Sequence, residues 1–212
     1  PFPAWPSMVW EVENFFEQMQ PWPTNHGSLH LYVLPTGKVL DRLLAAQQLI
    51  AGIDGLPPMP EPYLHLTLQR LAQFDDALTQ QDLSRLGQTL HESLATVPAF
   101  DIELGAPLVS PTAITCEGQP SAEWDALVLA ARSGIEAALG TEPPLFAPPH
   151  GPHVSLSYAI ASVPDGLVQA RLAPAEPIGV MRVDAVHLVS VSVRPQIGVF
   201  DFSHFASWSL AD

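Results

Sequence analysis

The sequence predicts an α+β fold with two lobes, each built around a largely antiparallel sheet. Apolar residues at helical spacing alternate with short strands, without the regular strand–helix–strand rhythm of a parallel sheet. One strand pattern occurs twice, 88 positions apart, at residues 65–68 and 153–156. Each copy follows a proline-rich stretch that is incompatible with a helix, at residues 57–62 and 148–152. These observations indicate a duplicated unit.

The remaining elements are predicted from apolar spacing and from residues that begin or end helices. Ser121 is expected to cap the start of a long helix, and Gly140 is expected to end it. Helices are predicted over Ser7–Gln18, Lys38–Gly52, Gln81–Ala95 and Ser121–Leu139, and strands over Leu29–Leu34, Phe100–Leu104, 107–109, 113–116 and 183–193. We therefore expect an N-terminal helical extension over residues 1–28, followed by one bilobal domain over residues 29–212.

Composition and charge restrict the location and the partners. The 212-residue chain has no apolar run near the roughly 20 residues that span a bilayer, and its N-terminal residues do not resemble a signal peptide. Its one cysteine, Cys116, suits a reducing compartment, so we expect a cytoplasmic protein without a membrane partner. With a formal charge of −14 and eight scattered Lys and Arg residues, the chain is not expected to bind long nucleic acids. No protein partner is predicted.

Each repeated pattern places polar groups on one face of a strand. Because alternate side chains of a strand share a face, His65 and Thr67 point one way and the two leucines of the HLTL pattern point the other. His153 and Ser155 share a face in the same manner in the HVSL pattern. Two imidazoles and two hydroxyls presented in duplicate suit acid–base chemistry on a phosphate ester.

A looser form of the pattern also occurs at residues 26–29 and 91–94. Both decoys lack an apolar residue between the histidine and the hydroxyl. His26 follows a turn-like stretch and precedes a glycine, whereas His91 lies in a segment with leucines at helical spacing. Neither decoy is therefore expected to present a polar strand face.

The alternation also predicts the positions that follow each motif. Gln69 and Ser157 are expected on the same face as the histidines. Arg70 is expected on the face opposite Thr67, where it would not be a phosphate ligand. Tyr158 is expected on the core face, where it would only pack.

The paired motifs resemble those of the two-histidine (2H) phosphoesterase superfamily, particularly its bacterial 2'-5' RNA ligase-like and cyclic nucleotide phosphodiesterase members. The resemblance extends from about Leu29 to the C-terminus and is specific only at the two histidine motifs. It implies two pseudo-symmetric lobes with antiparallel sheets around a central cleft and helices on the outside. It also implies a metal-independent phosphodiesterase that needs no cofactor and hydrolyses cyclic (2',3'-type) or 2'-5' phosphodiesters of a small nucleotide or RNA end.

In such chemistry, His65 and His153 are the candidate catalytic pair, because one group must take a proton from water while another gives a proton to the leaving oxygen. Thr67 and Ser155 are the candidate substrate-binding residues, since their hydroxyls can donate to the non-bridging phosphate oxygens. The sequence does not assign the base and the acid. Two alternatives stay open: a metal hydrolase, although no carboxylate accompanies the histidines at ligand spacing, and a nucleotide- or RNA-binding module with little turnover.

Overall fold

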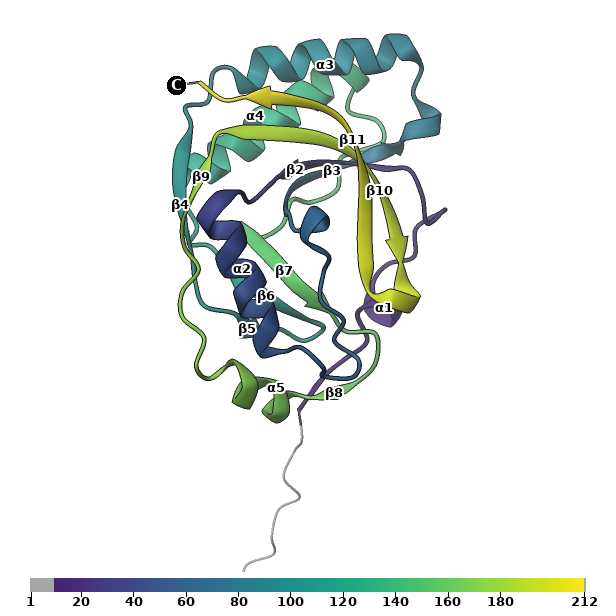
Figure 1. Ribbon diagram of the computed structural model, residues 1–212. Helices are drawn as coiled ribbons and strands as arrows, with labels where there is room; N and C mark the ends of the chain where they lie inside the picture. The colour runs from purple at the N-terminus through teal and green to yellow at the C-terminus, as the bar shows by residue number, and fades with distance from the viewer. Residues whose placement is uncertain (1–9, 212) are drawn as a thin grey trace, which may run out of the picture.

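The computed structural model describes residues 10–211, which form one large sheet, two small sheets and five helices (Figure 1). The large sheet has seven strands in the order β11-β10-β2-β3-β7-β6-β5, and every neighbouring pair in it is antiparallel. Its strands are β2 (Ser28–Val33), β3 (Leu66–Phe74), β5 (Leu108–Val109), β6 (Ala113–Glu117), β7 (His153–Tyr158), β10 (Ala185–Arg194) and β11 (Val199–Ser209). The two-stranded sheets pair β1 (Glu11–Val12) with β8 (Val163–Pro164), and β4 (Phe100–Leu104) with β9 (Gly179–Val183).

The large sheet is weakly joined at its centre. Strands β3 and β7 share a single Cα pair, Leu66 with Val154, whereas β10 and β11 pair along ten positions. The sheet therefore divides into a first half, β11-β10-β2-β3, and a second half, β7-β6-β5. The two halves meet only where the two sequence motifs lie, and the predicted antiparallel α+β architecture with two lobes is confirmed.

The helices cover the outside of this arrangement. Helices α3 (Gln80–Leu94) and α4 (Ala122–Leu139) pack together at the top of Figure 1, and α2 (Gly37–Leu49) lies against β7 and β9. The short helices are α1 (Phe15–Gln18) and α5 (Asp165–Leu172). None of the helices within residues 10–211 is long and apolar enough to cross a membrane.

The two long packed helices form where the sequence predicts them. The Ser121 side chain accepts a hydrogen bond from the Trp124 amide, so it caps α4 as expected. Gly140 follows the last turn with φ of 83°, a conformation that favours glycine. Gly134 lets α3 approach α4 closely, because a Cβ atom there would lie 2.6 Å from the Ser93 hydroxyl. The Thr89 hydroxyl donates to the Gly134 carbonyl across this contact.

Three segments differ from the sequence prediction. The predicted N-terminal helix is shorter, because Glu11–Val12 pairs with β8 and the helix begins only after Asn14, whose side chain caps it; residues 7–9 of that prediction lie outside the described part. No helix or strand was predicted for the stretch that forms β11, which pairs along the whole of β10. None was predicted for the stretch that forms helix α5 either.

Candidate active site

The four predicted site residues meet at the junction of the two lobes. His65 lies directly before β3, and His153 is the first residue of β7. In an antiparallel register, the pair Leu66–Val154 places His65 across from Ser155 and Thr67 across from His153. Leu66 and Val154 are fully buried on the other face. Both histidines and both hydroxyls therefore occupy one small area of the same face.

Each imidazole is held through the same nitrogen. His65 Nδ1 lies 2.7 Å from the Tyr63 carbonyl, and His153 Nδ1 lies 3.2 Å from the Gly151 carbonyl. Because a carbonyl oxygen only accepts, Nδ1 of both rings must carry the proton and donate it. Nε2 of each neutral ring is then a free proton acceptor. The two lobes thus orient their histidines in the same way, through the residue two positions earlier.

His65 is enclosed by aromatic rings. Tyr32 stacks on its imidazole with 3.9 Å between ring centroids and an angle of 11°, and Phe202 approaches edge-on at 5.9 Å. Burial lowers the pKa of His65 from 6.5 to about 4, against the opposing hydrogen bond to Tyr63, and the charge of nearby His153 lowers it further. His65 is therefore neutral at neutral pH.

The surroundings of His153 are more open and more polar. Its ring is partly exposed, and in the sheet it pairs with Glu117 of β6. A cavity of about 510 Å³ next to it is lined by Ser110, Thr115 and Glu117, and by His150 of the preceding loop. Thr115 Oγ1 is buried without a hydrogen-bond partner among the described residues. This side of the cleft therefore offers hydroxyl and carboxylate groups to a ligand.

Arg70 corrects the sequence prediction, because it lies on the same face as Thr67. In the pairing of β2 with β3, Tyr32 lies opposite Thr67, whereas Leu31 lies opposite Gln69. Leu68 therefore has no partner on β2 and forms a β-bulge. A bulge shifts every later side chain to the other face. Arg70 then pairs with His30 and joins Thr67 in lining a cavity of about 360 Å³.

The second motif contains the same bulge. Strand β6 pairs Thr115 with Ser155 and then Ile114 with Ser157, so Leu156 is the extra residue. Tyr158 therefore lies on the face of Ser155 rather than on the core face, and it packs against Phe15 at 4.4 Å between ring centroids. Burial raises the pKa of Tyr158, and the neighbouring Ser155 hydroxyl opposes that shift.

Gln69 and Ser157 were predicted on the histidine face, and this is also wrong. Both side chains are completely buried, and each holds the loop that leads to the other lobe's histidine. Gln69 Nε2 donates to the Phe146 carbonyl at 2.9 Å, and Ser157 Oγ donates to the Pro57 carbonyl at 2.7 Å. The bulge thus turns one polar side chain per motif into a brace between the lobes.

Arg70 is held between two aromatic rings. Its guanidinium carbon lies 4.6 Å from the Trp22 ring centroid and 4.2 Å from that of Phe146. Its Nε is buried without a hydrogen-bond partner among the described residues, and no carboxylate lines the cavity. Burial lowers the pKa of Arg70, while the group stays a cation at neutral pH. A fixed, unpaired guanidinium beside a hydroxyl is suited to an anion.

Comparison with known proteins identifies the family. The model of the 2'-5' RNA ligase superfamily matches residues 43–194, which include both motifs. The chain belongs to the 2'-5' RNA ligase superfamily. The two-histidine resemblance predicted from the motifs is thereby confirmed, while the roles of the four site residues remain predictions. A comparison with curated proteins finds no match.

Solved structures show the same superfamily fold at low sequence identity. TT0787 of Thermus thermophilus is 22% identical with a TM-score of 0.67, covering 86% of this chain and 97% of its own. LigT of E. coli, crystallised with NADP+, is 17% identical with a TM-score of 0.63, covering 88% and 99%. LigT has also been crystallised with 3'-AMP, ATP and phosphate. A structure described as a phosphoesterase is 15% identical with a TM-score of 0.65, covering 88% and 99%.

One sequence signal could have identified Arg70 in this superfamily member. Among its eight Lys and Arg residues, only Arg70 lies within ten positions of either motif histidine. Regular alternation along the strand placed the Arg70 side chain on the wrong face, because the bulge at Leu68 depends on how β3 pairs with β2. The aromatic clamp was equally hidden, since Trp22 and Phe146 are far from Arg70 in sequence.

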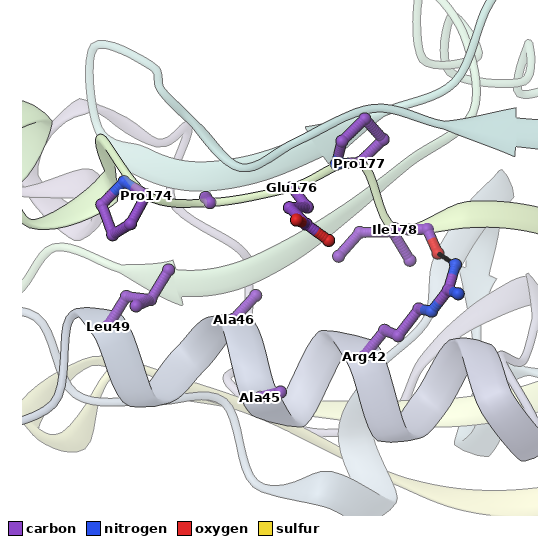
Figure 2. Close-up of a pocket in the computed structure, with 9 residues that line it drawn as sticks. Arg42, Ala45, Ala46, Leu49, Pro174, Glu176, Pro177 and Ile178 are labelled. Atoms are coloured by element: carbon purple, nitrogen blue, oxygen red, sulfur yellow. Dashed lines mark hydrogen bonds between the residues drawn. The ribbon is translucent and has the colours of Figure 1, made fainter.

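The cavity in Figure 2 lies away from the superfamily motifs. It measures about 200 Å³ and is formed by α2 and residues 174–178. Arg42, the one cation among its described lining residues, donates from Nη1 to the Ile178 carbonyl at 2.9 Å, so this guanidinium already has a partner. None of the motif residues lines it. The candidate site is therefore the two-histidine face and its two flanking cavities, which share Pro149 as a common wall.

Among residues 10–211, no group of three or more His, Cys, Asp or Glu side chains is arranged to hold a metal ion. The motif histidines are accompanied by Thr67 and Ser155, and hydroxyl groups are not among the usual zinc ligands. What these residues offer directly is proton transfer and hydrogen-bond donation.

Proposed function

We propose that this chain is a metal-independent phosphodiesterase that hydrolyses 2',3'-cyclic or 2'-5' phosphodiesters of a small nucleotide or RNA end. The observation that carries the proposal is the pairing of Leu66 with Val154. It sets two imidazoles on one face, each with Nδ1 tied to a carbonyl and Nε2 free. Two such groups on either side of a phosphorus atom supply the base and the acid that in-line hydrolysis requires.

The burial of His65 supports its role as the base and that of His153 as the acid. A neutral imidazole accepts a proton, so His65 Nε2 takes the proton of the attacking water while the water oxygen bonds to phosphorus. His153, in the more open and polar half of the site, donates a proton from Nε2 to the leaving ribose oxygen as the phosphorus–oxygen bond breaks. The product is a phosphomonoester with a free hydroxyl. Proton transfer through solvent then restores both rings.

The remaining groups act on the charge of the phosphate. Thr67 and Ser155, one on each strand, donate hydrogen bonds to the non-bridging oxygens, where negative charge increases in the transition state. Arg70 supplies the cation on the Thr67 side. Because Trp22 and Phe146 fix its guanidinium before a ligand arrives, little ordering is needed when the anion binds.

A nucleotide substrate is supported by the ligands seen in LigT, which include 3'-AMP and NADP+. A small substrate is supported by charge. The chain has a formal net charge of −14, and the described residues that line the two cavities include one arginine and no lysine. A single-stranded ligand that neutralised Z phosphates would weaken with salt at a log–log slope near −0.7Z. We expect a slope that corresponds to one or two phosphates.

Turnover of 2',3'-cyclic AMP in the presence of EDTA tests the proposal, with product formation followed by anion-exchange chromatography. We expect hydrolysis that chelation does not reduce. We also expect a bell-shaped pH profile whose acid limb in kcat/KM lies below pH 6.5, because the pKa of His65 is lowered to about 4. Nucleotide binding without turnover, or activity that disappears in chelator and returns with a divalent metal, would overturn the proposal. A long RNA preferred over the mononucleotide, with a steep salt slope, would overturn the small-substrate part alone.

A further inference from the structure

Half of the described residues that line the cavity beside Arg70 lie outside the matched family region. Among the described residues, four Phe and Trp rings line it, and those of Phe15, Trp22 and Phe200 lie outside residues 43–194. Phe15 and Trp22 come from the segment before the first strand of the large sheet. That segment places α1 beside the end of the β10–β11 hairpin (Figure 1). One wall of this cavity is therefore supplied by the N-terminal segment of this chain.

The N-terminal wall is fixed in place by aromatic packing. Phe15 and Trp22 both contact Phe200, with ring centroids 5.8 and 5.9 Å apart. The Phe15 amide donates to the Ala159 carbonyl, and the Asn14 side chain donates to the Ile160 carbonyl, both just after β7. The segment is thus attached to both lobes near the motif strands. Its rings are present in the cavity before any ligand binds.

The lining of the cavity selects one kind of occupant. It offers aromatic faces and proline rings, one guanidinium, and no carboxylate. Two buried nitrogens in it, Arg70 Nε and His30 Nδ1, have no hydrogen-bond partner among the described residues. Flat apolar walls with few polar groups suit a planar heterocycle, and base–aromatic stacking is favourable for every base. Thr67 belongs both to this cavity and to the two-histidine face, so a group joined to the bound phosphate can reach it.

We propose that Phe15 and Trp22 form the wall of a nucleobase subsite, so that the N-terminal segment determines the preference of this enzyme for nucleotides over base-free phosphodiesters. The base stacks in the aromatic cavity, His30 Nδ1 contacts its edge, and Arg70 contacts the attached phosphate. The kinetic test of this inference rests on the proposed function, because it requires turnover. The binding test does not.

The kinetic test compares 2',3'-cyclic AMP with ribose 2',3'-cyclic phosphate, which lacks the base. We expect Phe15→Ala to raise KM for cyclic AMP about tenfold, the size of one base–aromatic stack, and to change kcat/KM for the base-free substrate less than about twofold. Trp22→Ala also removes one of the two rings that clamp Arg70, so it should weaken both substrates, with a further loss of about tenfold for cyclic AMP. Trp22→Phe should retain most of the preference, because it keeps an aromatic face. Trp10→Ala is the matched control, since Trp10 lies in the same segment, is 69% exposed and does not line the cavity. Equal losses on both substrates, or no loss on either, would overturn the inference.

Binding of 3'-AMP, measured by titration calorimetry on the full chain, separates this inference from the proposed function. If neither cyclic substrate is turned over, the proposed function fails, and the binding comparison still decides the role of the wall. A Kd about tenfold weaker in Phe15→Ala, which leaves both rings of the Arg70 clamp in place, than in Trp10→Ala supports the subsite. An equal Kd in the two variants, both with melting curves like that of the unmodified chain, overturns it.

Discussion

The two motif strands share one construction. At the start of β3 and of β7, the Nδ1 of a histidine donates to the carbonyl of the residue two positions earlier. The hydroxyl residue lies two positions after the histidine, and the extra residue of a bulge follows it. The fourth residue after each histidine is buried and holds the loop that precedes the other histidine. The repetition extends beyond the motif itself. It includes the irregularity that decides which later side chains enter the cleft.

The fifth residue after each histidine is where the strands differ. The bulge brings Arg70 onto the cleft face in the first lobe and Tyr158 in the second. The histidines differ as well: His65 is stacked on Tyr32 and buried, whereas His153 is partly exposed. The same backbone thus presents a neutral imidazole beside a cation on one side and a more solvated imidazole on the other. The two strands share one geometry, and the surrounding side chains give each histidine a different environment.

Replacing either motif histidine should have the largest effect. His65→Ala and His153→Ala should each lower kcat for 2',3'-cyclic AMP by about 10²–10⁴-fold, because each removes one end of a proton transfer. The double variant should be little slower than either single variant, since both residues serve one step. Steady-state kinetics at saturating substrate measures this. Thr67→Ala and Ser155→Ala should cost less, because each removes one hydrogen-bond donor.

The decoy histidine His91 provides the control for this comparison. It has the same spacing to a serine as His153 but lies exposed on α3. His91→Ala should leave kcat unchanged. Near-full turnover by His65→Ala, in a variant that melts as the unmodified chain does, would exclude the two-histidine mechanism.

Arg70 and Tyr158 should differ although they occupy equivalent positions. Arg70→Gln should lower kcat/KM by about 10–100-fold, because it removes a charge-assisted hydrogen bond to the phosphate. Arg70→Lys should retain only part of the kcat/KM of the unmodified chain, since an ammonium keeps the charge but cannot stack as a plane between Trp22 and Phe146. Tyr158→Phe should lower kcat/KM by less than about threefold. If the Tyr158 variant lost as much as the Arg70 variant, the proposed asymmetry between the lobes would be wrong.

The sequence predicted the elements that regular periodicity defines. The long helices and β4 follow apolar spacing and caps such as Ser121, and the two motifs follow alternation along a strand. Alternation failed after Leu68 and Leu156, because a bulge depends on the register with a neighbouring strand, which no local pattern records. Arg70, Gln69, Tyr158 and Ser157 were all placed on the wrong face for this one reason. The aromatic enclosure of His65 was hidden too, since Tyr32 and Phe202 come from distant strands.

The different burial of the two histidines should appear in the pH dependence of stability. An unfolded chain protonates His65 near pH 6.5, whereas the folded chain resists protonation until about pH 4. The unfolded state therefore binds more protons in this window, and the free energy of unfolding falls as the pH is lowered through it. The contribution of His65 to this loss should be about 2 kcal/mol between pH 7 and pH 5. Urea unfolding of the chain and of His65→Asn at both pH values gives the free energy of unfolding of each protein. The contribution of His65 is the difference between the two proteins in how far this free energy falls from pH 7 to pH 5.

His153→Asn is the matched comparison for that measurement, because the imidazole of His153 is partly exposed whereas that of His65 is buried. His30 is also buried and remains in both variants. Its pKa is lowered, mainly by burial and then by the charges of Arg70 and His65, so it too reduces the stability of the fold as the pH falls. Because burial is the largest cause of the His30 shift and is kept in both variants, most of this contribution cancels when the variants are compared with each other. A variant lacking His65 that loses stability between pH 7 and pH 5 as steeply as the unmodified chain would show that the aromatic enclosure does not hold this imidazole neutral. The assignment of His65 as the base would then lose its physical support.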